Sequence, residues 1–130
     1  MPDGKRKVLF VDDNPSMVKM YGKRFEVAGY EVLTAGDGEE ALAKIGSERP
    51  DVIVLDIELP KLNGYEVCAA VKQRQETKHI PVIMFTAKGQ PQEHLAGLMF
   101  GADVYVSKSC QAKVLLDQVE RVLASRPARG

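Results

Sequence analysis

Short apolar runs of strand length alternate along the chain with segments in which apolar residues recur at helical spacing. Such runs, bounded by polar or turn residues, predict five strands, at residues 8–11, 30–35, 52–55, 81–85 and 103–106. A helix is expected after each strand, and this repeat is typical of a parallel sheet with helices on both faces. The predicted fold class is therefore α/β, a doubly wound five-stranded parallel sheet.

Capping residues mark the ends of the predicted helices. Asn14 followed by Pro15 predicts the start of the first helix, and Gly29 its end in a left-handed conformation. Ser109 is expected to cap the last helix. The other boundary signals are two capping-box pairs and two residues that flank the fourth helix: Asp37 with Glu40, Asn63 with Glu66, and Pro91 with Gly101.

Polar side chains follow four of the five predicted strands. They are Asp12 and Asp13 after the first strand, Asp56 after the third, Thr86 after the fourth and Lys108 after the fifth. Because the carboxyl ends of parallel strands lie on one edge, where ligands bind in open α/β sheets, these side chains are expected to meet. The second strand contributes no such group, which is consistent with a place at the border of the sheet.

These residue types predict a particular chemistry. Three carboxylates at one place repel one another, and a divalent cation with a preference for oxygen ligands relieves the repulsion. Mg²⁺ fits best, because it is held by a few carboxylates while it keeps water and phosphate ligands. Lys108 and Thr86 could each contact a phosphate oxygen. The set predicts transfer of a phosphoryl group onto Asp56, a step that depends on positioning and charge neutralisation.

Composition narrows the possible partners. The 130 residues suit one domain, and 18 basic residues balance 18 acidic ones. There is no basic field for direct binding of nucleic acid or an anionic membrane, no run of membrane-spanning length and no secretory signal. We therefore expect a cytoplasmic protein. Cys68 and Cys110 match no metal or redox spacing; Cys68 is expected in the core, whereas the role of Cys110 is left open.

The stretch from Asp56 to Gly64 resembles the receiver domain of two-component response regulators, of the chemotaxis-regulator kind. The Asp12–Asp13 pair also lies as far upstream of Asp56 as the family pattern requires. The resemblance covers residues 7–124 and leaves 1–6 as an N-terminal leader and 125–130 as a tail or truncated linker. It implies a flavodoxin-like sheet in the order 2-1-3-4-5. A chemotaxis member of the family is the usual example of that order, so the order is carried over from the resemblance.

The resemblance also implies roles for the acidic residues. Asp13 would bind Mg²⁺ directly and Asp12 would support it, and Asp56 and the backbone carbonyl of Glu58 would complete the metal site. Asp56 would be phosphorylated by a histidine kinase, a phosphotransfer protein or a small phosphodonor. The chain would be a phosphoacceptor and not an enzyme, with at most slow self-phosphorylation and self-dephosphorylation.

The resemblance also implies a conformational switch that follows phosphorylation. Thr86 would turn inward to the phosphate, and Tyr105 would move with it and reshape the face formed by the fourth helix, fifth strand and fifth helix. An unidentified downstream protein would bind there. The family commonly has proline after its lysine, in a cis peptide, whereas this chain has Ser109. A cis bond before a residue other than proline costs about 2.5–4 kcal/mol, so we predict a trans Lys108–Ser109 peptide, or else a strained cis one held by its surroundings.

Four alternatives remain open to comparison. The chain could be a receiver fragment of a larger regulator or hybrid kinase, or a receiver-shaped module that takes no phosphate. It could be a phosphohydrolase with an aspartyl nucleophile, with Glu58 as the further acid two residues on. The stretch 36–41 also fits a loose dinucleotide fingerprint, with Asp56 twenty positions after its start, but Asp37, Glu39 and Glu40 would crowd the pyrophosphate.

Overall fold

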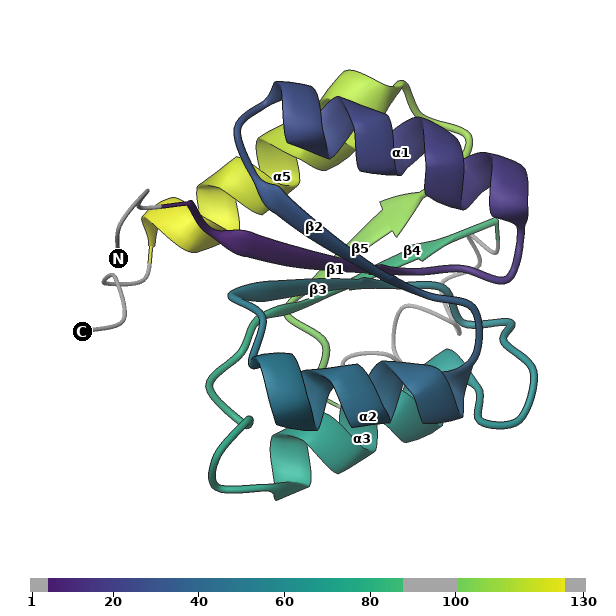
Figure 1. Cartoon of the computed structure of the whole chain (residues 1–130), viewed down its shortest axis with the longest axis vertical. Helices are drawn as coiled ribbons and strands as arrows, with labels where there is room; N and C mark the ends of the chain where they lie inside the picture. Colours follow the sequence, from purple (N-terminus) through teal and green to yellow (C-terminus); the bar gives the residue numbers. More distant parts are fainter. Residues whose placement is uncertain (1–4, 88–100, 126–130) are drawn as a thin grey trace.

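Strands and helices alternate from β1 to β4, as Figure 1 shows for the computed structural model, which describes residues 5–87 and 101–125. In chain order they are β1 (Lys7–Val11), α1 (Pro15–Val27), β2 (Glu31–Ala35), α2 (Gly38–Glu48), β3 (Val52–Leu55), α3 (Gly64–Gln73), β4 (Val82–Thr86), β5 (Val104–Ser107) and α5 (Ala112–Ala124). The helix predicted to begin at Pro91 lies outside the described residues.

The sheet is parallel throughout and has the order β2-β1-β3-β4-β5, as predicted. β2 lies at one border and is only partly buried, whereas all four residues of β3 are buried. This difference explains why the sequence of β3 is apolar throughout while that of β2 alternates weakly.

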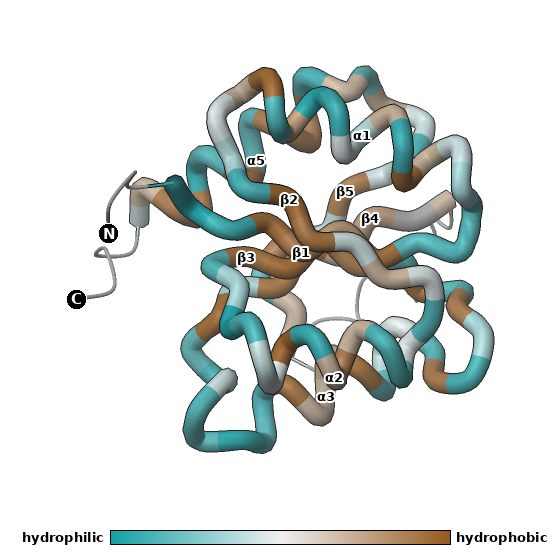
Figure 2. Tube along the Cα trace, viewed as in Figure 1, coloured by the Kyte–Doolittle hydropathy of each residue, from teal (hydrophilic) through white to brown (hydrophobic). Residues whose placement is uncertain are grey.

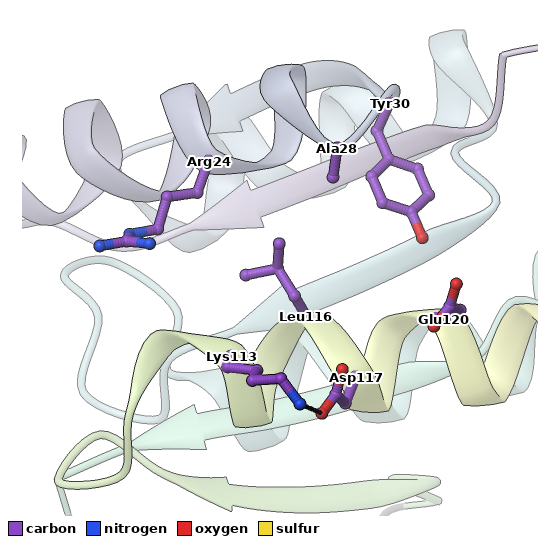
Figure 3. A pocket seen from close by; sticks show the side chains of 7 residues that line it. All are labelled: Arg24, Ala28, Tyr30, Lys113, Leu116, Asp117 and Glu120. Carbon is purple, nitrogen blue, oxygen red and sulfur yellow. Dashed lines mark hydrogen bonds and ion pairs between the residues drawn. The ribbon is translucent and has the colours of Figure 1, made fainter.

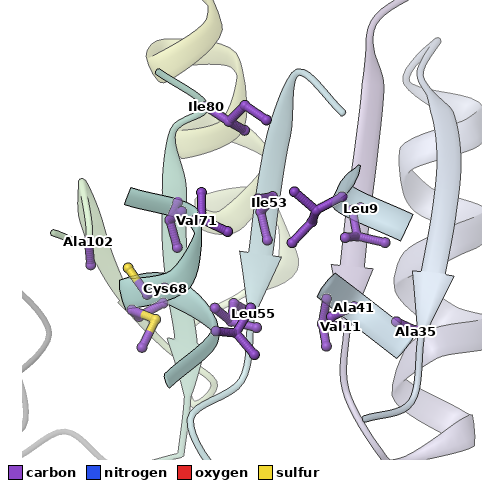
Figure 4. Packing of buried hydrophobic residues seen from close by; sticks show 14 of the residues in the cluster. Leu9, Val11, Ala35, Ala41, Ile53, Leu55, Cys68, Val71, Ile80 and Ala102 are labelled. Atoms are coloured by element: carbon purple, nitrogen blue, oxygen red, sulfur yellow. The ribbon is translucent and has the colours of Figure 1, made fainter. Parts of the chain in front are cut away.

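Each strand of the sheet contributes side chains to two separate hydrophobic cores, one on each face of the sheet. Leu9, Val11, Ile53 and Leu55 point to the side covered by α2 and α3, where Figure 4 shows their packing. Alternate residues of the same strands point to the other side, which α1 and α5 cover. Figure 2 shows the apolar strands at the centre and hydrophilic residues on the outer turns of the helices. The fold is therefore doubly wound, as the pattern of the sequence indicates.

The helix caps follow the sequence with two differences. Asn14 caps α1, and Asn63 with Glu66 forms a complete capping box on α3. In α2 the amide of Glu40 donates to Asp37 at 2.8 Å, but the carboxylate of Glu40 accepts from the amide of Gly36 and so does not close the box.

The prediction that Ser109 caps the last helix is wrong. The N-cap of α5 is Gln111, which makes no side-chain cap bond. A turn separates β5 from α5, and within it the hydroxyl of Ser109 pairs with that of Ser107 at 2.7 Å. The turn delays the helix, so Ser109 lies too early to reach the first helical amides.

No helix within residues 5–87 and 101–125 is both long enough and apolar enough to cross a membrane.

The two cysteines are expected to differ in reactivity. Cys68 is fully buried, and burial raises the pKa of its thiol to about 11. Because the thiolate is the nucleophile, Cys68 should resist iodoacetamide at about pH 8 in the folded protein, while the half-buried Cys110 is modified. Mass spectrometry of the digested protein measures both. In urea both should be modified, and equal labelling of the two in the native protein would contradict the prediction.

Candidate functional site

The register of the strands aligns their carboxyl ends. Val11 of β1 lies opposite Leu55 of β3, so Asp12 and Asp56 each come directly after a paired residue. The amide of Asp56 donates to the carbonyl of Val11 at 3.1 Å, which continues the ladder by one step. Both carboxylates are therefore held at the edge of the sheet by backbone hydrogen bonds rather than by a flexible loop.

Three carboxylates gather at this edge. One oxygen of each of Asp12, Asp13 and Asp56 lies within 4.8 Å of the others. Asp12 is 1% exposed and Asp56 is 6% exposed, whereas Asp13 faces solvent. Beside Asp12 and Asp13 a pocket of about 320 Å³ opens between the starts of α1 and α2. The group thus has a buried base and an open side.

Lys108 brings a positive charge to the two buried acids. It follows the end of β5, and its Nζ lies 2.7 Å from Oδ2 of Asp12 and 3.0 Å from Oδ2 of Asp56, to which it donates a hydrogen bond. The Lys108–Ser109 peptide is trans, as predicted, since no cis bond occurs in the described chain. The lysine therefore reaches the acidic group without the cis proline of the family pattern.

The surroundings of the site shift two of its pKa values. Burial raises the pKa of Asp56, with a smaller rise from the charge of Asp12, and the hydrogen bond and charge of Lys108 oppose this rise. Burial lowers the pKa of Lys108, but its contacts with the two carboxylates outweigh burial, so its pKa is raised. Lys108 is consequently a permanent cation at neutral pH.

The donor set fits a hard divalent cation. Oδ1 of Asp12 accepts from the amide of Asn14, and its buried Oδ2 is paired with Nζ of Lys108 at 2.7 Å, while Asp13 and Asp56 add two more carboxylates. Three carboxylates beside a single lysine leave net negative charge at the site, which a bound cation would neutralise. Ligands of one Mg²⁺, at about 2.0–2.1 Å each, lie at most about 4.2 Å apart. The oxygens of the acidic group are already close to that spacing.

Glu58 contacts this group through its backbone, and Thr86 lies on β4, the strand next to β3. Thr86 ends β4 and lies opposite Ser107 in register, one residue before Lys108; its side chain lies outside the described atoms. The amide of Glu58 donates to Oδ1 of Asp56 at 3.3 Å, and its side chain is exposed. The backbone of the loop after β3 therefore contacts the buried acid directly.

Tyr105 has a partner that sequence reasoning missed. It is half-buried on β5, and its hydroxyl lies 3.4 Å from the hydroxyl of Tyr65 on α3. Both rings pack at the margin of the core under α2 and α3. No local signal in the sequence joins the two tyrosines, which are forty residues apart, because only the folded sheet brings them together.

A second pocket, of about 350 Å³, lies between α1 and α5 and is drawn in Figure 3. Its charged residues have both signs: Arg24 lies on α1, whereas Lys113, Asp117 and Glu120 lie on α5, where Lys113 pairs with Asp117 at 3.3 Å. This balance favours no ligand charge. The acidic edge is the better candidate for chemistry.

Removal of the Lys108 charge should destabilise the fold. In Mg²⁺-free buffer we expect Lys108→Met to lower the free energy of unfolding by about 2–4 kcal/mol, because two buried carboxylates lose their shared cation while Lys108 is itself 19% exposed. Urea denaturation measures this change. Adding Asp56→Asn to Lys108→Met should restore part of the loss, since one of the repelling charges disappears.

The matched control is Lys113→Met, which removes an exposed lysine from an i,i+4 pair and should cost less than about 0.5 kcal/mol. Equal stabilities of Lys108→Met and the unmutated chain would show that Lys108 does not balance the buried acids.

Comparison with known proteins gives the site a family. Residues 8–120 match the response regulator receiver domain. The chain is 43% identical over 118 residues to the alkaline phosphatase synthesis transcriptional regulatory protein PhoP of Bacillus subtilis, a match that covers 91% of this chain and 48% of that protein. The chain thus spans about half the length of the curated relatives it matches.

Comparison with solved structures leads to the same family. The chemotaxis protein CheY4 of Vibrio cholerae superposes with a TM-score of 0.87 and 38% identity, covering 92% of this chain and 99% of that one. The receiver domain of a signal transduction histidine kinase from Syntrophus aciditrophicus has a TM-score of 0.88 and 30% identity, covering 96% and 95%. By the match, the fold and these likenesses, the chain belongs to the family of response regulator receiver domains.

Proposed function

We propose that this receiver domain accepts a phosphoryl group on Asp56, with Mg²⁺ held by Asp12, Asp13, Asp56 and the backbone carbonyl of Glu58. The observation that carries the proposal is the position of Lys108, whose Nζ lies within 3.0 Å of both buried carboxylates. A cation fixed beside an acid at the strand ends, with two more acids in reach, provides what phosphoryl transfer needs.

In the proposed step, an ionised oxygen of Asp56 attacks the phosphorus of a phosphohistidine on a histidine kinase or phosphotransfer protein. The Oδ–P bond forms as the P–N bond breaks, and the imidazole nitrogen leaves with the electron pair. Bound Mg²⁺ would neutralise charge on the phosphoryl oxygens. Asp56 must be ionised for attack, and Lys108 favours that form by opposing the rise that burial causes in the pKa of Asp56.

Lys108 has a second role in the proposal. Its ammonium group, held between two carboxylates, can turn from Asp56 to a phosphoryl oxygen without leaving Asp12, since both oxygens are within 3.0 Å. The family resemblance assigns the hydroxyl of Thr86 to another phosphoryl oxygen. Preorganised charges of this kind stabilise a transferring group because they need no rearrangement during the reaction.

We propose that a movement of Tyr105 transmits the phosphorylation of Asp56 to a partner protein. The resemblance implies that Tyr105 moves with Thr86 and reshapes the face of the fourth helix, β5 and α5. In the structure the hydroxyl of Tyr105 is near that of Tyr65, so a rearrangement of Tyr105 would separate these two groups. An unidentified protein is the proposed downstream partner, and the proposed location is the cytoplasm.

The lengths of the relatives bear on which protein segments flank the domain. Because the chain spans about half of the regulators it matches, it can act as the receiver of a longer protein, and one structural neighbour is the receiver of a histidine kinase. Relatives include a DNA-binding transcriptional regulator of Synechocystis. Any contact with DNA is proposed to belong to a part outside this chain, because its charges balance and give no basic field.

Asp56→Asn should abolish phosphorylation. Incubated with a small phosphodonor and Mg²⁺, the unmutated chain is expected to gain one phosphoryl group, seen as a mass increase that hydroxylamine removes. The amide of asparagine is not nucleophilic, so the variant should gain none. The control is Asp51→Asn, an aspartate just before β3 and so at the opposite edge of the sheet, which should be labelled like the unmutated chain. Full labelling of Asp56→Asn would refute the assignment.

The same incubation separates the receiver from a phosphohydrolase. A receiver should take up phosphate once and slowly, whereas an aspartyl phosphohydrolase should release phosphate continuously. Glu58 is placed by sequence where such an enzyme has its further acid, so Glu58→Gln should abolish turnover in that case. Sustained release from the unmutated chain that Glu58→Gln stops would favour the hydrolase.

A further inference from the structure

The Gly36–Gly38 stretch has a role that its sequence pattern does not suggest. Gly38 is the first residue of α2 and is buried. A Cβ built on it would lie 2.5 Å from Cβ and 2.9 Å from the carbonyl carbon of Leu62, and closer still to the carbonyl oxygen. The space in front of Gly38 is thus filled by the loop of residues 56–63, which we call the β3–α3 loop.

The β3–α3 loop is attached to the start of α2 by polar contacts as well. The amide of Gly38 donates to the carbonyl of Pro60 at 3.3 Å, and the same carbonyl accepts from the amide of Leu62 at 2.9 Å. Nζ of Lys61 lies 3.8 Å from carboxylate oxygens of both Asp37 and Glu39. The acidic residues that crowd the helix start therefore face a loop of the same chain.

The loop is attached to the acidic site at its other end. The amide of Glu58 donates to Asp56, and the amide of Gly64 donates to the carbonyl of Ile57 at 2.8 Å. A Cβ on Gly64 would lie 2.8 Å from Cα of Ile57, so here too the backbones are in contact. A loop fixed at both points has little freedom to shift at Glu58 alone.

From these contacts we propose that Gly38 is a positioning residue for the metal site, acting through the β3–α3 loop to place the carbonyl of Glu58. The inference rests on the proposed function, because it assigns that carbonyl to Mg²⁺. A side chain on Gly38 would push Leu62 away, and because the amide of the nearby Gly64 is bonded to the carbonyl of Ile57, the displacement would reach the adjacent Glu58. Partners of a metal ligand commonly matter nearly as much as the ligand itself.

The test compares Gly38→Ala with Gly46→Ala, a change in the same helix whose Cβ would meet nothing within 4 Å. Mg²⁺ binding to each folded protein is measured by isothermal titration calorimetry, together with the rate of phosphorylation as Mg²⁺ is varied. We expect Gly38→Ala to weaken Mg²⁺ binding by about 10- to 100-fold, with a smaller loss of rate once Mg²⁺ saturates. Gly46→Ala should bind as the unmutated chain does.

A second variant covers the case in which Gly38→Ala does not fold. Lys61 is 58% exposed, and Lys61→Glu would set a third negative charge against Asp37 and Glu39 and push the loop outward. By its field alone an added negative charge would strengthen Mg²⁺ binding. Weakening, expected at about two- to fivefold, would therefore reflect displacement of the loop and not the field of the added charge.

The outcomes separate the inference from the function beneath it. A folded Gly38→Ala that binds Mg²⁺ like the unmutated chain overturns the inference, and so does unchanged or tighter binding by Lys61→Glu when Gly38→Ala is unfolded. Asp13→Asn serves as the control for the site and should lose Mg²⁺ binding. If the unmutated chain itself binds no Mg²⁺, the proposed function fails first, and the inference fails with it.

Discussion

The ammonium group of Lys108 between Asp12 and Asp56 is the interaction on which the site depends. Two carboxylates, 1% and 6% exposed, end neighbouring strands and would repel each other without a cation. Lys108 comes from β5, which is separated from β1 by β3 and β4. The ion pair therefore joins both halves of the sheet at one edge, and the order of the strands is a condition for the chemistry as well as for the core.

One lysine does not neutralise all of the negative charge at this edge of the sheet. Lys108 sets one positive charge against the two buried carboxylates, and Asp13 adds a third negative charge on the open side. A divalent cation would supply what is missing, since the remaining donors are all oxygens. The site thus combines a built-in cation that is always present with room for a second one, and this allows Asp56 to be buried and still act as a nucleophile in the proposed step.

Local signals predicted the alternating elements and the gathering of the acidic residues, and the family resemblance supplied the order of the strands, whereas contacts between distant segments escaped prediction. The apolar runs of β1 and β3, and caps such as Asn14 and Asn63, depend on neighbours within a few residues. Ser109 was misjudged because a turn intervenes before α5, and nothing in the sequence reports the length of that turn. The pair of Tyr65 and Tyr105 depends on the packing of α3 beside β5, which no spacing in the chain encodes.

The glycines of the 36–38 stretch show why a motif needs its surroundings. After a strand and before a helix, glycine can leave room for a phosphate or for another part of the protein, and the two uses look alike in sequence. The two uses are distinguished by the group that fills the space next to the glycine, and at Gly38 this group is Leu62, chiefly its backbone carbonyl. The acidic residues Asp37 and Glu39 repel a phosphate but attract Lys61. The charge around a glycine, more than its spacing, therefore indicates which use the fold makes of it.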